Sequence, residues 1–107
     1  MEPAFSSKFM RNLATEPKEA YKHLGPENGQ VFIGLVADFR AALFAGDVPS
    51  DPMSVRREGN RFELEWFVAS GCSVKTVVAA KGNSDDAWKD AHRIRLECVT
   101  HGKEILA

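Results

Sequence analysis

The chain is short of cysteine and carries almost no net charge. It has two cysteines in 107 residues, and its 14 lysine and arginine residues nearly balance its 15 aspartate and glutamate residues, for a formal charge of -1. Two cysteines without a secretory signal are too few for a disulfide-stapled scaffold, so we expect Cys72 and Cys98 to be reduced thiols. The balanced charge gives neither a global positive field for nucleic acid nor the negative surplus of a DNA mimic.

Long apolar segments are also missing. The longest apolar run, Val31 to Gly46, is too short to span a bilayer, and residues 1–21 contain no apolar stretch of signal-peptide length. We therefore expect a cytoplasmic protein that does not enter a membrane. A hydrophobic content of 44% in a chain of this length suits one core, so residues 1–107 are expected to form one domain.

Motifs of catalysis are absent as well. The chain contains no glycine-rich phosphate-binding loop, no HExxH and no GxSxG. Cys98 and His101 would be neighbours on a helix, but His92 would point elsewhere, which leaves two ligands where structural zinc takes four. Cys72 has no histidine or basic residue beside it in sequence to activate the thiol. The sequence therefore predicts no catalytic residue, no metal, no cofactor and no enzymatic activity.

What the chain does contain predicts three N-terminal helices. Apolar residues recur at helical spacing after Ser7 and again after Thr15, and either residue can cap a helix. The run from Val31 to Gly46 follows the same spacing, with Ile33 and Phe44 on a second apolar strip, so more than half of its circumference is apolar. We therefore expect the third helix to lie between the other helices and a sheet, or to be covered by a partner protein.

A β-hairpin is predicted next, because RFELEWFV alternates apolar and polar residues. Residues 59 and 60, Gly-Asn, suit a two-residue hairpin loop. This register places apolar residues opposite one another on the inner face and opposite charges on the outer face, so a slip of one residue would break both. The predicted pairs are Met53 with Trp66, Val55 with Leu64, Arg56 with Glu63, and Glu58 with Arg61.

A third strand is predicted over residues 73–81. A three-residue turn at residues 70–72 would set Val68 against Val74 and Trp66 against Thr76, which completes a three-stranded antiparallel meander.

A C-terminal helix is predicted to begin after Ser84 and to end at Gly102. The segment RIRLECVT, residues 93–100, also alternates, so a fourth strand is the alternative. We prefer the longer helix because no turn residue separates its two halves. The expected fold class is thus α+β, with three N-terminal helices, a three-stranded meander and a C-terminal helix packed in two layers.

Phe67 departs from the alternation, because it stands on the polar face beside Lys75. Burying a Phe contributes about 1.5–3 kcal/mol, which exceeds a surface charge pair, so Phe67 should be covered. The cover could be the tail at residues 105–106, another protein or a second copy of the chain. The predicted partner-binding residues are Phe67, Lys75, Val77 and Glu65.

These features favour a small non-enzymatic interaction module, an inhibitor, adaptor or regulator that docks on a partner protein. The same profile suits small standalone proteins of phages and mobile elements, and a homodimer is compatible with it. The alternative is a nucleic-acid-binding regulator that uses a basic β-hairpin. Its candidate residues are Arg56, Arg57, Arg61, Lys75 and Lys81. Interleaved glutamates explain most of these arginines as cross-strand charge pairs.

Overall fold

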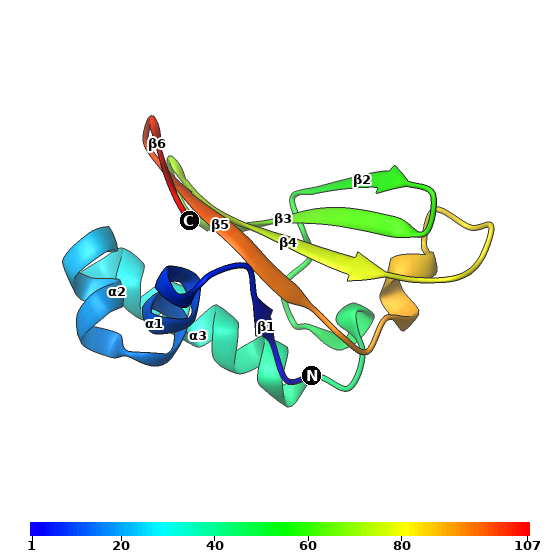
Figure 1. The fold of residues 1–107 in the computed structure, drawn as a ribbon, viewed down its shortest axis with the longest axis horizontal. Coiled ribbons are helices and arrows are strands. Elements are labelled where there is room, and N and C mark those ends of the chain that lie inside the picture. Colours follow the sequence, from blue (N-terminus) through cyan, green and yellow to red (C-terminus); the bar gives the residue numbers. More distant parts are fainter.

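The computed structural model describes all 107 residues and has the α+β architecture shown in Figure 1. Three α-helices precede most of a six-stranded mixed sheet. The elements in chain order are β1 (Ala4–Phe5), α1 (Lys8–Thr15), α2 (Pro17–Leu24), α3 (Pro26–Ala41), the 3-10 helix η1 (Ala45–Asp47), β2 (Ser54–Glu58), β3 (Arg61–Ala69), β4 (Cys72–Ala79), the 3-10 helix η2 (Ala87–Asp90), β5 (Arg95–His101) and β6 (Glu104–Leu106).

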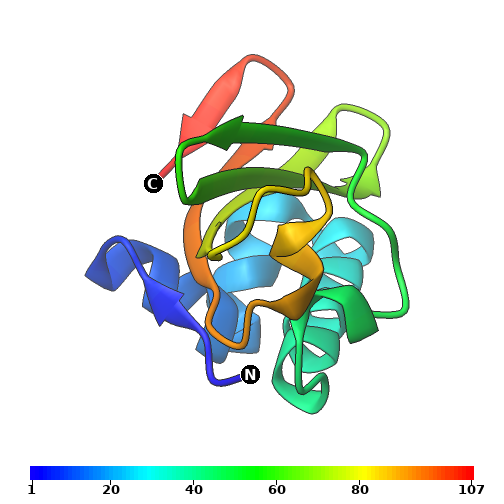
Figure 2. The same ribbon diagram turned by 90° about the vertical axis from the view of Figure 1, so that its right-hand side faces the viewer.

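The sheet has the strand order β1-β5-β4-β3-β2, and β6 also pairs with β5. Only β1 is parallel to its neighbour, and all other pairs are antiparallel. The three α-helices lie on one side of the sheet, while the segment between β4 and β5 folds back at its end (Figures 1 and 2). The core therefore forms between the helices and one sheet face.

The predicted C-terminal helix is wrong, and so is the three-stranded sheet. After Ser84 the only helical element is the short 3-10 helix η2. The chain leaves it at Ala91, whose carbonyl accepts a hydrogen bond from the Ala45 N–H at 2.8 Å, and this bond holds the segment beside η1. The alternating segment then forms β5, which buries Leu96 and Val99 and pairs with β4. Pairing satisfies the backbone groups that β4 would otherwise leave free at its edge, so a non-local contact outweighs the local helical spacing.

The third helix ends earlier than predicted, at Ala41 instead of near Gly46. Beyond it the chain is extended, which brings the Ala45 N–H to its partner carbonyl on Ala91. Phe44 consequently lies past the end of the helix and is exposed.

The buried side of α3 faces the other helices and β3. It consists mainly of Phe32, Leu35, Val36 and Phe39, which are all buried. Val31, which belongs to the same apolar run, is exposed, so the apolar side is narrower than the sequence suggests. The other helices and the sheet cover this one side of α3, whereas the second apolar strip predicted from the sequence is not buried: Ile33 is half-buried and Phe44 is exposed.

The predicted register of the first hairpin is confirmed. Val55 pairs with Leu64, and Arg56 pairs with Glu63. The predicted Met53 partner is wrong, because the Met53 N–H donates to the Glu65 carbonyl at 2.7 Å, outside the regular ladder.

In the second hairpin, the side chains point to the predicted sides of the sheet, but the residue pairs differ from those predicted. Trp66 pairs with Val74 instead of Thr76, and Ala69 pairs with Cys72 around a two-residue turn. Val68 is the extra residue of a β-bulge. The offset from the prediction is two residues, an even number, so each side chain keeps its predicted face.

Two glycines of α3 provide a matched test of helix packing. A Cβ on Gly29 would lie 2.8 Å from Cδ1 of Tyr21 and 3.0 Å from the backbone of Ala20, whereas a Cβ on Gly34 would meet nothing within 4 Å. We expect Gly29→Ala to destabilise the fold by about 1–3 kcal/mol through overpacking of α2 against α3. Gly34→Ala should stabilise it by about 0.5–1 kcal/mol, because Ala is the better helix former. Urea unfolding followed by circular dichroism measures both, and equal shifts in the two variants would contradict this packing.

Candidate functional site

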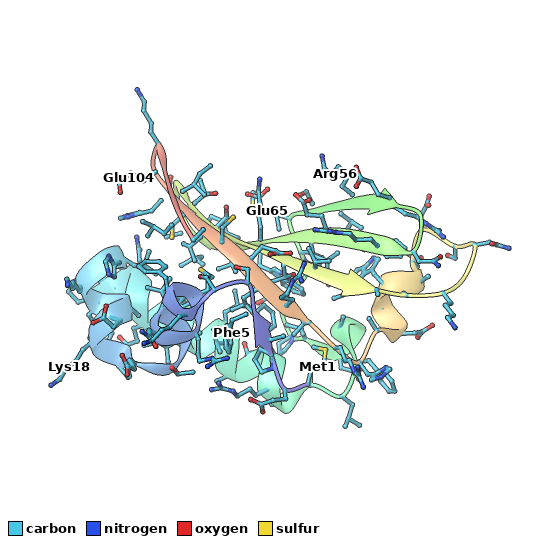
Figure 3. All side chains as sticks on the ribbon, in the orientation of Figure 1. Met1, Phe5, Lys18, Arg56, Glu65 and Glu104 are labelled. Carbon is cyan, nitrogen blue, oxygen red and sulfur yellow. The ribbon has the colours of Figure 1, made fainter.

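The sheet face that points away from the helices is not covered by any other element (Figure 1). Arg56 and Glu65 project from this side in Figure 3. We call it the outer face. By strand register it carries Ser54, Arg56 and Glu58 from β2, Arg61, Glu63, Glu65 and Phe67 from β3, Ser73, Lys75, Val77 and Ala79 from β4, and Arg95, Cys98 and Thr100 from β5.

Phe67 is the large apolar side chain of β3 on this face, and 60% of it is exposed. Met53 is nearby and 58% exposed, and both residues line a hollow of about 240 Å³ together with Glu65 and Thr100. The Ser73 hydroxyl, directly across from Phe67, donates to Oε2 of Glu65 at 2.6 Å, which holds that carboxylate beside the ring. The result is an apolar centre with a fixed polar border.

The four predicted partner-binding residues lie on this one face, but not all at one place. Phe67 pairs with Ser73, not with Lys75 as expected, and Lys75 pairs with Glu65. Val77 lies four residues along β4 from Ser73, which corresponds to about 13 Å. Phe67, Glu65 and Lys75 thus form a cluster, which we call the Phe67 cluster and to which Met53 belongs. Val77 lies toward the opposite end of the outer face.

The chain does not cover Phe67 with its own tail. Ile105 and Leu106 form β6, which pairs with β5 and extends the sheet at its edge. Ile105 pairs with Thr100 and is itself 69% exposed. The tail therefore adds an exposed apolar residue instead of hiding one.

Met53 was not expected at this site. Strict alternation from Val55 assigns it to the inner face, but the strand begins only at Ser54 and Met53 lies outside the ladder. Pro52 precedes it, and a proline, which cannot donate to the ladder, is typical of the start of a strand, where regular pairing has not yet begun.

The five residues of the nucleic-acid alternative are dispersed. Arg56 Nη2 lies 2.8 Å from Oε2 of Glu63, and Arg61 Nη2 lies 3.5 Å from Oε1 of Glu97. Lys75 stands across from Glu65, and Lys81 lies in the loop after β4.

Arg57 differs from the other four, because its side chain points to the inner side. Its guanidinium donates to the carbonyls of Gly59 and Ser84, both at 2.9 Å, and to that of Gly82. The same group stacks over the Phe62 ring at 5.0 Å. Arg57 thus links the loop after β4, through Gly82 and Ser84, to the hairpin formed by β2 and β3.

Arg57→Ala should therefore destabilise the fold by about 1.5–3 kcal/mol, since a charged donor with several carbonyl partners is lost. Arg56→Ala is the matched control and should cost less than about 1 kcal/mol, because its ion pair with Glu63 is on the surface. Chemical denaturation of both variants checks the difference. Similar losses would show that Arg57 does not fasten the loop.

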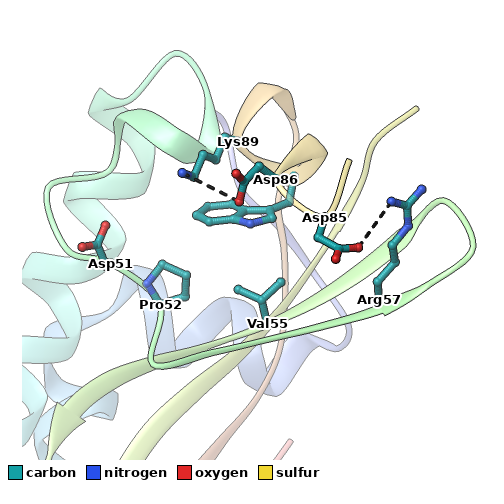
Figure 4. Close-up of a pocket in the computed structure, with 8 residues that line it drawn as sticks. Asp51, Pro52, Val55, Arg57, Asp85, Asp86 and Lys89 are labelled. Carbon is teal, nitrogen blue, oxygen red and sulfur yellow. Dashed lines mark ion pairs between the residues drawn. The ribbon is translucent and has the colours of Figure 1, made fainter. Parts of the chain in front are cut away.

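The largest hollow of the molecule, about 580 Å³, lies between β2 and η2 (Figure 4). Four of its five charged groups form two pairs: Arg57 Nη1 lies 3.9 Å from Asp85, and Lys89 Nζ lies 3.9 Å from Asp86. Such exposed pairs are weak and solvated. The hollow is lined by Asp51, Pro52, Val55, Arg57, Asp85, Asp86, Trp88 and Lys89.

Both cysteines are free thiols in the structure. Burial raises the pKa of Cys72, and burial also raises the pKa of Cys98, which opposes thiolate formation in both. Cys98 lies on the outer face, while His101 pairs with Cys72 and points to the other side, so the two are not neighbours. No group of three His, Cys, Asp or Glu side chains is placed to hold a metal ion.

No protein-family model, curated protein or solved structure matches the chain. None of the helices combines the length and the apolarity needed to cross a bilayer.

Proposed function

We propose that this protein is a non-enzymatic interaction module that docks on a partner protein through the outer face of its sheet, with the Phe67 cluster at the centre of the contact. The observation that carries the proposal is that Phe67 is 60% exposed on a face that no other element covers. An inhibitor, adaptor or regulator acts in this way.

The composition around Phe67 supports docking on a protein. Protein interfaces place an aromatic anchor at the centre and polar groups at the rim, and a few such anchors carry most of the binding energy. Here Phe67 and Met53 are apolar, Glu65 and Thr100 line the same hollow, and Lys75 lies across from Glu65. Burial of Phe67 by a partner would contribute about 1.5–3 kcal/mol.

We also propose a cytoplasmic location, which the two free thiols support because thiols stay reduced in that compartment. A second copy of the chain is one form that the partner can take. Sedimentation equilibrium of the wild type and Phe67→Ala distinguishes it, because a homodimer through this face would dissociate in the variant.

Affinity capture from a lysate of the source organism tests the proposal. The immobilised baits are the wild type, Phe67→Ala and Tyr21→Ala, and the last is a matched control because Tyr21 is an exposed aromatic residue on α2. We expect proteins that the wild type and Tyr21→Ala retain and that Phe67→Ala loses. If all three baits retain the same proteins, the contact is elsewhere and the proposal fails.

A further inference from the structure

A second hollow lies on the outer face at the end opposite to the Phe67 cluster. Its volume is about 350 Å³, and it combines three arginines with an apolar lining. We call it the arginine hollow. It is lined by Ala4, Arg61, Val77, Ala79, Arg93, Ile94 and Arg95.

Two of these arginines converge on one point. Arg95 donates from Nε and Nη2 to Oε1 of Glu97 at 3.1 and 2.6 Å, and Arg61 Nη2 lies 3.5 Å from the same oxygen. Glu97 is the extra residue of a β-bulge in β5, which turns its carboxylate onto the face that carries Arg95. Bulges are over-represented where a side chain must be re-aimed, and they often border binding sites.

The positive charge of the hollow is only partly compensated. Glu97 is the single carboxylate within 4 Å of its arginines, and Arg93 has no acidic partner within that distance. Glu58 pairs with Arg61 across the hairpin but lies beyond ion-pair distance, and Glu63 is held by Arg56. The hollow is thus lined by three arginines, and the single nearby carboxylate, that of Glu97, pairs with only two of them.

The lining between the arginines is apolar. Val77 is half-buried, and Ala79 and Ala4 are exposed, so their methyl groups are accessible to a ligand. Guanidinium groups bind carboxylates and phosphates through paired hydrogen bonds. The apolar residues of the hollow contribute binding free energy only when a ligand buries apolar surface against them.

We propose that the arginine hollow binds a small organic anion, a carboxylate or phosphate monoester carried on an apolar body of about the size of a benzene ring. The anionic group contacts Arg93 together with Arg61 and Arg95, and the apolar body lies on Val77 and Ala79. This site is independent of docking through Phe67, so either proposal can fail without the other.

A nucleic-acid backbone fits this face less well than a small anion does. Glu58, Glu63, Glu65 and Glu97 interrupt the arginines along the sheet, whereas a phosphate backbone is bound by a continuous basic track. The hollow accommodates one anionic group with its apolar neighbour.

Amide chemical shifts recorded during ligand titration test the site. The probes are phenyl phosphate, benzoate, inorganic phosphate, the neutral analogue benzyl alcohol and a short single-stranded oligonucleotide. We expect saturable shifts at Val77, Arg93 and Arg95 with phenyl phosphate or with benzoate, and the probe that binds identifies the anionic group. Inorganic phosphate should bind at least about fivefold more weakly because it makes no apolar contact, and benzyl alcohol should not saturate.

Arg93→Ala should weaken binding of the aromatic anion by about tenfold or more, since a charge-assisted hydrogen bond is lost at an exposed position that does not support the fold. Arg11→Ala is the matched control, because it removes the same charge from α1, and it should leave the affinity unchanged. Retained dispersion of the amide spectrum shows that each variant is folded.

Three results would overturn the proposal. Neither aromatic anion saturates, or Arg93→Ala and Arg11→Ala weaken binding equally. Alternatively, the oligonucleotide binds more tightly than phenyl phosphate and loses affinity with either arginine variant, which is the behaviour of a diffuse polyanion surface.

Discussion

Trp66→Ala is expected to destabilise the fold by about 3–5 kcal/mol, the largest stability effect that we predict for one side chain. Trp66 is fully buried between β3 and α3, and its ring packs edge-to-face on Phe39 with the centroids 5.0 Å apart. Its indole N–H donates to Oγ1 of Thr76 at 2.8 Å, so no polar atom of the ring is left unpaired. The change would leave a cavity between the sheet and the helix that the structure can close only in part.

Two further variants separate the packing of Trp66 from its hydrogen bond. Trp66→Phe keeps most of the ring and removes the donor, and Thr76→Val removes the acceptor. The two losses should be less than additive, because both changes break the hydrogen bond between Trp66 and Thr76. Thr76→Val also removes the 3.4 Å hydrogen bond that its hydroxyl donates to the Leu64 carbonyl. Urea unfolding followed by far-ultraviolet circular dichroism gives all the stabilities. A loss below about 1 kcal/mol in Trp66→Ala would mean that the sheet and α3 do not depend on this contact.

Phe67→Ala, in contrast to Trp66→Ala, is expected to leave the stability of the fold nearly unchanged. It should weaken partner binding by about 2 kcal/mol or more, which is about 30-fold in Kd. Phe67 is on the adjacent position of the same strand as Trp66, but its side chain points to the uncovered outer face. Its removal exposes no core, so stability should change by less than about 0.5 kcal/mol. Calorimetric titration with the captured partner measures the affinity.

The controls for Phe67→Ala are Tyr21→Ala on the helical side and Val77→Ala at the far end of the outer face. Both should keep nearly full affinity for the partner, since hot spots are confined to a few central residues. If Phe67→Ala instead unfolds the protein, the residue belongs to the core and the outer face is not exposed in solution. If it folds and binds normally, docking through the Phe67 cluster is excluded.

The first hairpin could be predicted from sequence because two independent constraints select one register. Apolar pairs such as Val55 with Leu64 and charged pairs such as Arg56 with Glu63 are both satisfied by the same alignment, and a two-residue loop at Gly59 and Asn60 permits it. The second hairpin lacked this protection. Its inner residues on β4, Val74, Thr76 and Val78, are compatible with either of two registers, so the bulge at Val68 could not be deduced.

The segment after Ser84 could not be predicted because its local pattern fits two structures. Residues from Ala87 to Val99 have apolar spacing suitable for a helix, and residues 93–100 also alternate. Whether this segment forms a helix or a strand depends on two contacts: the pairing of β5 with the free edge of β4, and the hydrogen bond between Ala45 and Ala91. Both are contacts between segments far apart in sequence, and propensity is too weak to oppose them.

The candidate site was predictable to the extent that it lies within one hairpin. The break in alternation at Phe67 identified the exposed aromatic residue directly. Arg93 and Arg95 were missed because they belong to the segment predicted as a helix, so their position beside Arg61 on β3 follows only from the sheet order.

Site-specific photocrosslinking tests docking through the outer face most directly. A photoreactive phenylalanine analogue is placed at position 67 in one variant and at position 21 in another, and each is irradiated with the captured partner. The proposed function predicts a covalent adduct from position 67 and none from position 21, because only the first lies in the contact. An adduct from position 21 with none from position 67 would show that the partner binds the helical side and would contradict the proposal.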